Sequence, residues 1–226
     1  MKYAAYCMTR NVYHKVIPSL NSLLTNSSVD KVFLIAEDDY VGFELPERVQ
    51  VVNQKNQKFF LPDGPNYNCR WTYMCMMRIP LCHIFPEYDR ILTLDHDTIV
   101  EANIDSLWDT RIDDFYYAGV DEVSCATEGP WSNSGVILWN LRKMRDRMAD
   151  KIIHELNTVH YNFPEQECMN KLCKGKIYTL SSAYNVCRYT RPAPYPKIYH
   201  FAATPQWYET KPLVKKYMND GKVVGT

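Results

Sequence analysis

The chain has 226 residues, 46% of them hydrophobic and 13% aromatic, and its 26 basic residues balance its 26 acidic ones. A chain of this length can bury a substantial core, and we expect a single domain over residues 1–226. Zero net charge provides no general field for nucleic acid or an anionic membrane. We therefore expect no nucleic-acid partner, and a local site for any anionic ligand.

No apolar run is long enough to span a bilayer, and the run after Lys2 is too short for a signal peptide. The expectation is a soluble, cytoplasmic protein. The eight cysteines include no C-x-x-C pair, which disfavours zinc ribbons and thioredoxin-type redox sites. Most are expected to be buried free thiols in a reducing compartment.

The first hundred residues predict alternating strands and helices. Residues 2–8 form a buried strand, and the spacing of Val16, Leu20, Leu23 and Leu24 is helical. Further strands are predicted over 30–37, 49–52 and 90–94, a loop up to residue 67, and a helix over 73–85 that Pro80 interrupts. This strand, helix, strand beginning with a parallel pair is typical of nucleotide-binding domains.

The rest of the chain predicts more strands and three longer helices. The strands are expected over 115–120, 135–140, 177–180 and 197–201, and the helices over 141–159, 164–174 and 209–220. Pro164 suits the first turn of its helix because the fixed φ of proline is tolerated there. Together the elements indicate an α/β fold.

An acidic pair directly follows the strand predicted over 90–94. Asp95 and Asp97 are two apart on an extended segment, so their carboxylates point the same way and can converge on one ion. Mg²⁺ and Mn²⁺ take one or two carboxylates, sometimes an imidazole, and diphosphate oxygens. The same triplet also occurs in turns, where Asp caps the next element. Alone, it leaves both interpretations open.

Four sequence blocks, in order, resemble glycosyltransferase family 8, the glycogenin and galactosyltransferase-like enzymes with the GT-A fold. The blocks are Tyr6–Tyr13 with Pro18–Leu24, Tyr88–Val100 with Ile104–Leu107, Trp131–Leu141, and Pro164–Asn170 with Leu180–Asn185. Each block is weak, but four in the right order make the resemblance specific. It implies a GT-A fold, which is a single Rossmann-like domain with a mixed, mainly parallel central sheet flanked by helices. Residues 1–100 would be the nucleotide-binding half, ending in the D-x-D motif, and residues 101–226 the sugar donor and acceptor half.

The resemblance implies nucleotide contacts near the first strand. Thr9 and Asn11 would lie near the ribose and uracil, and Tyr13 would stack on the base, although Tyr13 also suits plain packing under the first helix. Arg78 would reach the diphosphate or the sugar hydroxyls of the donor.

The later blocks imply contacts to the donor sugar. Asn133 and Ser134 would bind sugar hydroxyls, and Gly135 would let the strand backbone approach closely. Gln166 would lie beneath the anomeric carbon. Glu165 stands where the family has Asp and would also bind sugar hydroxyls.

The implied metal site consists of Asp95, Asp97 and His200, with His96 among the donor-binding residues. After His200 the chain departs from the family pattern, because Ala203 replaces a glycine and the expected lysine is absent. Lys211 is the alternative. If Lys211 does not substitute, stabilisation of the leaving group depends on the metal and Arg78.

The resulting hypothesis is a metal-dependent, retaining glycosyltransferase of glycan biosynthesis. It would move a hexose from a UDP-sugar, UDP-glucose or UDP-galactose, to a glycan or other hydroxyl acceptor, with Mn²⁺ or Mg²⁺ as cofactor and Gln166 and Arg78 as catalytic residues. Trp71–Tyr73, Trp207–Tyr208 and the loop over 189–195 are candidate acceptor walls. Additional domains or a homodimer remain open.

Two alternatives stay open. A non-catalytic module that binds a nucleotide-sugar or a glycan is favoured by the missing lysine. A sugar nucleotidyltransferase should carry a glycine-rich loop after the first strand, and Cys7–Asn11 has no glycine.

Overall fold

A computed structural model of the chain describes residues 1–123, 131–204 and 206–225. The strands are β1 (Tyr3–Cys7), β2 (Lys31–Ala36), β3 (Val49–Asn53), β4 (Arg90–Leu94), β5 (Thr98–Val100), β6 (Tyr117–Asp121), β7 (Ser132–Asn140), β8 (Ile177–Thr179) and β9 (Ile198–His200). The α-helices are α1 (Val16–Asn26), α2 (Leu81–Ile84), α3 (Leu141–Lys143), α4 (Ala149–Thr158), α5 (Pro164–Leu172), α6 (Trp207–Thr210) and α7 (Pro212–Lys216).

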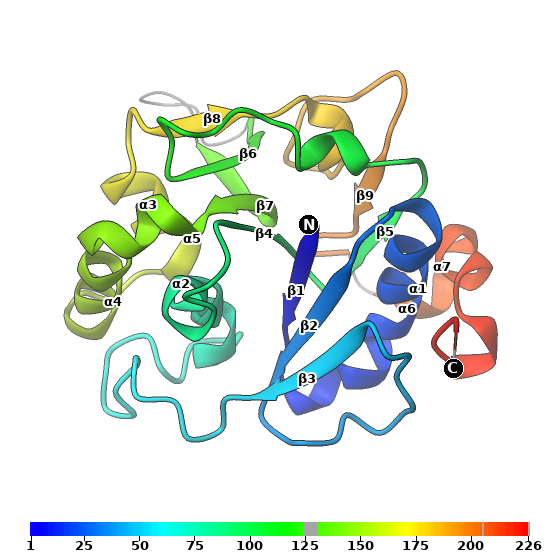
Figure 1. The fold of residues 1–226 in the computed structure, drawn as a ribbon, viewed down its shortest axis with the longest axis horizontal. Coiled ribbons are helices and arrows are strands. Elements are labelled where there is room, and N and C mark those ends of the chain that lie inside the picture. The colour runs from blue at the N-terminus through cyan, green and yellow to red at the C-terminus, as the bar shows by residue number, and fades with distance from the viewer. Residues whose placement is uncertain (124–130, 205, 226) are drawn as a thin grey trace.

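In this part of the chain, seven strands form one sheet in the order β3-β2-β1-β4-β7-β6-β8, and β5 pairs with β9 in a second sheet (Figure 1). The pairs from β3 to β4 are parallel, β7 is antiparallel to both β4 and β6, and β8 is parallel to β6. The predicted mixed, mainly parallel sheet is confirmed.

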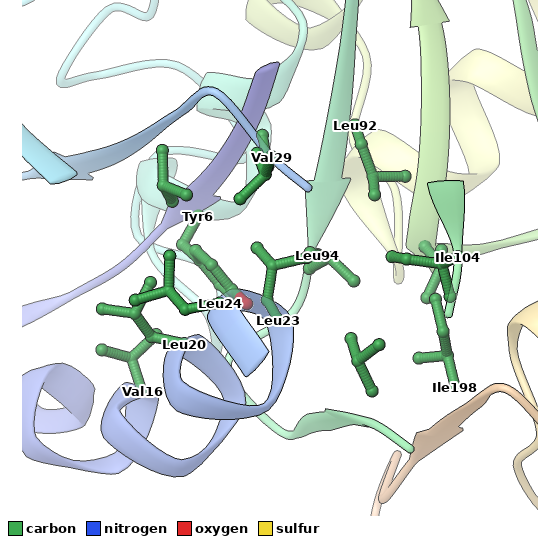
Figure 2. Close-up of a cluster of buried hydrophobic side chains, with 14 of the residues drawn as sticks. Tyr6, Val16, Leu20, Leu23, Leu24, Val29, Leu92, Leu94, Ile104 and Ile198 are labelled. Atoms are coloured by element: carbon green, nitrogen blue, oxygen red, sulfur yellow. The ribbon is translucent and has the colours of Figure 1, made fainter. Parts of the chain in front are cut away.

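The central strands are buried on both faces, so their side chains alternate between two cores. On β1, Ala4 and Tyr6 face one core and Ala5 faces the other. Figure 2 shows the first core, in which Tyr6 and the β4 residue Leu94 lie close to the α1 residue Leu20. The second core contains apolar side chains of α2, α4 and α5. Helices therefore cover both faces of the sheet and hold the ends of its strands in place.

The single helix predicted over 141–159 is wrong, because the chain leaves helical geometry between α3 and α4. Arg147 has a φ of 66°. The buried residues on either side of the break, Met144 and Ala149, are five positions apart, whereas a straight helix repeats a buried position after three or four. The irregular turn absorbs the extra residue and keeps both segments packed.

The closing helix predicted over 209–220 is also wrong. It is divided into α6, α7 and a 3₁₀ turn, Asn219–Gly221. Pro212 begins α7, and Lys211 before it is extended, with a ψ of 121°. Proline lacks the N–H that would continue α6 and disfavours helical geometry in the preceding residue. The short strand β5 was not predicted.

Among the described residues, none of the helices has the length and apolar composition needed to cross a membrane. The seven described cysteines are free thiols, as predicted, but only Cys82, Cys168 and Cys173 are buried and the other four are half-buried. Cys125 lies outside the described residues.

Candidate active site

A cavity of about 480 Å³ lies at the carboxyl ends of β1 and β4. The antiparallel strand β7 begins at the same edge, because Leu94 at the end of β4 pairs with Val136. Ligands of open α/β sheets typically bind outside the carboxyl ends of the strands. The cavity brings together most of the predicted site residues: Thr9, Asn11, Arg78, Asp95, His96, Asp97, Asn133, Ser134, Glu165, Gln166 and His200.

Asp95, Asp97 and His200 form a compact group that we call the metal corner. The pairing of β5 with β9 places His200 opposite Thr98, and the Phe201 N–H donates to the carbonyl of Asp97 at 2.9 Å. The His200 Nε2 lies 3.3 Å from Asp97 Oδ1 and 3.6 Å from Asp95 Oδ2. One ligand atom from each of the three residues lies within 4.8 Å of the others.

The charges of the metal corner are strongly coupled. Burial opposes the ionisation of Asp97 and of His200. The nearby His200 nevertheless lowers the pKa of Asp97, and the carboxylates hold the pKa of His200 well above its usual value. Two carboxylate oxygens and one imidazole nitrogen are donors that suit Mn²⁺ or Mg²⁺. The residues therefore fit a divalent cation.

His200 is held in one orientation by two neighbours. Its Nδ1 lies 3.0 Å from the amide oxygen of buried Asn185, which leaves Nε2 facing the carboxylates. Its ring also covers Gly135, where an added Cβ would lie 2.1 Å from His200 Cε1. Glycine at this position is therefore required by the close approach of the ring.

Arg78 lies at the base of the cavity, with only 4% of its surface exposed. Its Nη2 donates to Asp95 Oδ1 at 2.6 Å, its Nε donates to the carbonyl of Cys75 at 3.1 Å, and its Nη1 donates to the carbonyl of Ser134. Burial opposes its charge, but the neighbouring Asp95 and Glu165 raise the pKa of Arg78 further above its usual value. A fixed cation therefore lies directly beside the metal corner.

A second group, which we call the polar shelf, consists of Glu122, Asn133, Ser134, Glu165 and Gln166. The Asn133 amide donates to Glu122 Oε1 at 2.6 Å and accepts from the Gly135 N–H and from Asn185. The Gln166 amide accepts from the Ser134 N–H at 2.9 Å and donates to Glu122 at 3.2 Å. The Ser134 hydroxyl donates to Glu165 at 3.1 Å. The shelf is thus a connected hydrogen-bond network.

The predicted nucleotide contacts are brought together only in part. Thr9 and Asn11 line the cavity and are hydrogen-bonded to each other. Tyr13 is buried in the core next to α1, and its hydroxyl donates to Asp38 at 3.2 Å and accepts from the Glu37 N–H at 2.8 Å. Tyr13 is not among the cavity-lining residues. Base stacking by Tyr13 stays a prediction.

The stretch after His200 keeps a glycine-like backbone without the glycine. Ala203, where the resemblance led us to expect glycine, has a φ of 50°. That left-handed region is costly for a residue with a Cβ. Ala202 and Ala203 line the cavity, whereas Lys211, the possible substitute for the missing lysine, does not.

Comparison with known proteins identifies the family. The model of glycosyl transferase family 8 matches residues 4–211. The chain belongs to glycosyl transferase family 8. Among curated relatives of this family 8 chain, GlyB of Streptococcus pneumoniae is 27% identical over 168 residues, which is 73% of this chain and 39% of GlyB. The lipopolysaccharide 1,2-glucosyltransferase of Escherichia coli is 30% identical over 112 residues, which is 43% of this chain and 33% of that enzyme. The chain thus spans less than half the length of these relatives.

Solved structures show that the family 8 chain has the GT-A fold. An active-site mutant of LgtC superposes with a TM-score of 0.76 at 17% identity, covering 96% of this chain and 94% of LgtC. The galactosyltransferase LgtC with donor and acceptor sugar analogs superposes with a TM-score of 0.68 at 18% identity, covering 89% and 87% of the two chains.

Sequence reasoning missed two polar residues of this family 8 site. Glu122 joins Asn133 to Gln166, and Asn185 joins His200 to Asn133. Asn185 is the last residue of one of the four matching blocks, so the family resemblance could have identified it as a site residue. Glu122 follows β6 without a motif, and only the pairing of β6 with β7 places it at the shelf.

Proposed function

We propose that the chain is a metal-dependent glycosyltransferase that transfers a hexose from a UDP-sugar to a hydroxyl of a glycan or another acceptor, with retention of anomeric configuration. The observation that carries the proposal is the metal corner beside Arg78 in a family 8 cavity. The relatives support it, because they include a glucosyltransferase and a galactosyltransferase bound to donor and acceptor sugar analogs.

The metal corner and Arg78 would together address the diphosphate of the donor. Asp95, Asp97 and His200 would hold Mn²⁺ or Mg²⁺, which when bound neutralises the negative charge that develops on the leaving group. Arg78 would add a fixed positive charge that burial keeps unscreened. Arg70 and Arg78 are the only lysine or arginine side chains among the described cavity-lining residues. Much of the electrostatic stabilisation would therefore come from Arg78 and the ion.

The polar shelf would hold the sugar. Gln166 is oriented by two hydrogen bonds, one at each end of its amide. Its carbonyl oxygen has a second lone pair, which can face the positive charge that develops at the anomeric carbon. Glu165 and Ser134 would bind the sugar hydroxyls. Transfer to an acceptor on the same face as the departing diphosphate would retain the anomeric configuration.

The mouth of the cavity would receive the acceptor. Trp71 and Phe163 line it from two separate segments, with ring centroids 5.7 Å apart and 41% and 53% of their surfaces exposed. Exposed aromatic rings of this kind offer apolar faces to a sugar ring. The proposed nucleotide contacts would come from residues before 100 and the proposed sugar contacts from residues after it, which is the division into a nucleotide half and a sugar half that we propose.

The test is turnover of a panel of UDP-sugars with Mn²⁺, measured as UDP release with and without simple glycoside acceptors. We expect slow hydrolysis of at least one donor and faster release with an acceptor, and NMR of the product should show the anomeric configuration of the donor. Gln166→Ala should lower the rate by about 100-fold or more while donor binding changes little. Unchanged transfer by Gln166→Ala would remove Gln166 from the mechanism.

A non-catalytic module that binds a nucleotide-sugar is the second candidate. It is favoured by the absence of lysine among the described residues that line the cavity. Such a module would bind a UDP-sugar in a Mn²⁺-dependent manner, detected by thermal shift, but would release no UDP with any donor and acceptor. That pair of results would replace the enzyme proposal with the binding module.

A further inference from the structure

Two cysteines lie together beside the cavity. Cys69 precedes the turn that leads into the 3₁₀ segment Tyr73–Arg78, Cys75 lies within that segment, and their sulfur atoms are 3.9 Å apart. Both thiols donate to the same acceptor, the carbonyl of Thr72, at 3.4 and 3.3 Å. Cys75 lines the cavity, and both cysteines are half-buried. The two sulfur atoms therefore already lie next to each other at the edge of the cavity.

The two thiols differ in chemical character. Contact with the Cys75 thiol lowers the pKa of Cys69 to about 7, and the same contact together with burial raises the pKa of Cys75. The thiolate is the reactive form of cysteine. Cys69 is thus suited to react first, with Cys75 beside it as the second thiol.

We propose that Cys69 and Cys75 are a modification site that a peroxide converts into an intramolecular disulfide, and that formation of this disulfide weakens the ion pair between Arg78 and Asp95.

The chemistry balances without a bound cofactor. The Cys69 thiolate attacks one oxygen of hydrogen peroxide, the O–O bond breaks, and a sulfenic acid forms on Cys69 while the departing hydroxide takes up the proton that the thiol had lost and becomes water. The sulfur of Cys75 then attacks the sulfenic sulfur, the S–S bond forms, and hydroxide leaves with the thiol proton as water. The two thiols lose two electrons in total, and one peroxide is reduced to two molecules of water.

We expect closure of the disulfide to shift the turn that supports Arg78. The sulfur atoms have to approach from 3.9 Å to about 2.05 Å. The carbonyl of Cys75 accepts from Arg78 Nε at 3.1 Å, and Arg78 in turn donates to Asp95. Oxidation also removes both thiol donors from the Thr72 carbonyl. Thr72 has a φ of 57°, so the turn between the cysteines is strained in the reduced state.

The modification is tested on the whole chain by peptide mapping under non-reducing conditions after titration with hydrogen peroxide. We expect one cross-linked peptide that joins Cys69 to Cys75 and disappears with dithiothreitol. Cys69→Ser, which removes a thiol outside the cavity lining, should keep the ordinary fold and give no such peptide. Failure of the wild type to form this link, or conversion of Cys69 to a sulfinic acid instead, would overturn the proposal.

The coupling to Arg78 is tested by Mn²⁺ affinity, measured by electron paramagnetic resonance of free Mn²⁺. This part rests on the proposed metal corner. We expect the oxidised wild type to bind Mn²⁺ about 10-fold more weakly than the reduced protein, as for loss of a group that supports a metal ligand. Dithiothreitol should restore the affinity, and peroxide should leave Cys69→Ser unchanged.

The two ways of failing are distinguishable. Equal Mn²⁺ affinity of the cross-linked and reduced proteins overturns the coupling to Arg78. Absence of Mn²⁺ binding in the reduced wild type contradicts the proposed metal corner, whereas the peptide map still decides the modification.

Discussion

The metal corner and the polar shelf line the same cavity, but their polar groups are satisfied in different ways. The metal corner brings the carboxylates of Asp95 and Asp97 within reach of one imidazole, so it concentrates charge. In the shelf, the amides of Asn133 and Gln166 each have partners at both ends. Like charges held close together favour a cation, whereas a connected hydrogen-bond network is stable without one.

Asn185 connects these two regions. Its amide oxygen faces His200 Nδ1, and its amide nitrogen donates to Asn133 at 2.8 Å. The orientation of the proposed metal ligand is therefore linked to the orientation of the shelf. Variants at this boundary can separate the two regions.

The largest effect is expected for Gly135→Ala. The added Cβ would lie 2.1 Å from His200 Cε1, so the imidazole must leave its position in the metal corner. We expect Mn²⁺ affinity to fall by about 100-fold or more, the upper end of the effects seen when support for a metal ligand is lost. Titration with Mn²⁺ by calorimetry measures it.

Gly64→Ala is the matched control. It makes the same chemical change in a loop outside the cavity lining, where the nearest atom to the new Cβ is the Leu61 carbonyl oxygen at 3.0 Å. Its Mn²⁺ affinity should equal that of the wild type. If Gly135→Ala also bound Mn²⁺ normally, His200 would not be a ligand.

A smaller effect is expected for Asn185→Ala. This change removes the oxygen that faces His200 Nδ1 and the amide N–H that donates to Asn133. We expect about 10-fold weaker Mn²⁺ binding together with weaker binding of the UDP-sugar. Asn185→Asp retains an acceptor for His200 but not the donor to Asn133. It should therefore bind Mn²⁺ at least as well as the wild type while donor binding stays weakened. Equal loss of metal affinity in both variants would contradict the role of the acceptor.

The regular parts of the fold were predictable because their packing is periodic. The strand at Arg90–Leu94 reads as an apolar run, and α1 shows its buried side as Val16, Leu20 and Leu23. The break at Arg147 was not predictable from pattern alone. The apolar spacing there is compatible with one continuous helix, and tertiary contacts decide where the extra residue is accommodated.

The site was predictable to the extent that it follows motifs. Asp95 and Asp97 lie two apart in sequence, but the expected extended segment is wrong, because a turn closed by the Thr98 N–H and the Asp95 carbonyl at 3.2 Å brings them together. The approach of His200 depends instead on the pairing of β9 with β5, a short strand that the sequence pattern did not predict. Long-range strand pairing does not appear in local sequence, so only the family resemblance pointed to His200.

A still smaller effect is expected for Ala203→Gly, outside both regions. Ala203 has a φ of 50°, and glycine adopts this conformation without a steric penalty. We expect the free energy of unfolding to rise by up to about 1 kcal/mol, since relief of strain exceeds the added flexibility of the unfolded chain. Urea denaturation measures it. The control Ala202→Gly, at a position without positive φ, should instead lower stability by about 0.5 to 1 kcal/mol.

The last prediction concerns Asp105, a carboxylate outside the cavity that is satisfied by donors of the protein, among them the Lys2 ammonium, and not by a metal ion. Burial opposes its ionisation, but donors from Ser28 and from Lys2 lower the pKa of Asp105 to about 2. Because the folded pKa is below the unfolded one, ionised Asp105 stabilises the fold at neutral pH, and this contribution is lost as the pH falls from about 4 to 2.

Asp105→Asn should therefore unfold at a lower urea concentration than the wild type at pH 7, and the difference should shrink toward zero near pH 2. Addition of Mn²⁺ should leave the difference unchanged, because Asp105 already has its own donors. A difference that stays constant from pH 7 to pH 2 would show that the carboxylate charge of Asp105 does not stabilise the fold. A difference that depends on Mn²⁺ would instead show that Asp105 is coupled to the metal corner. Asp105 would then no longer contrast with the carboxylates that we expect to bind a metal ion.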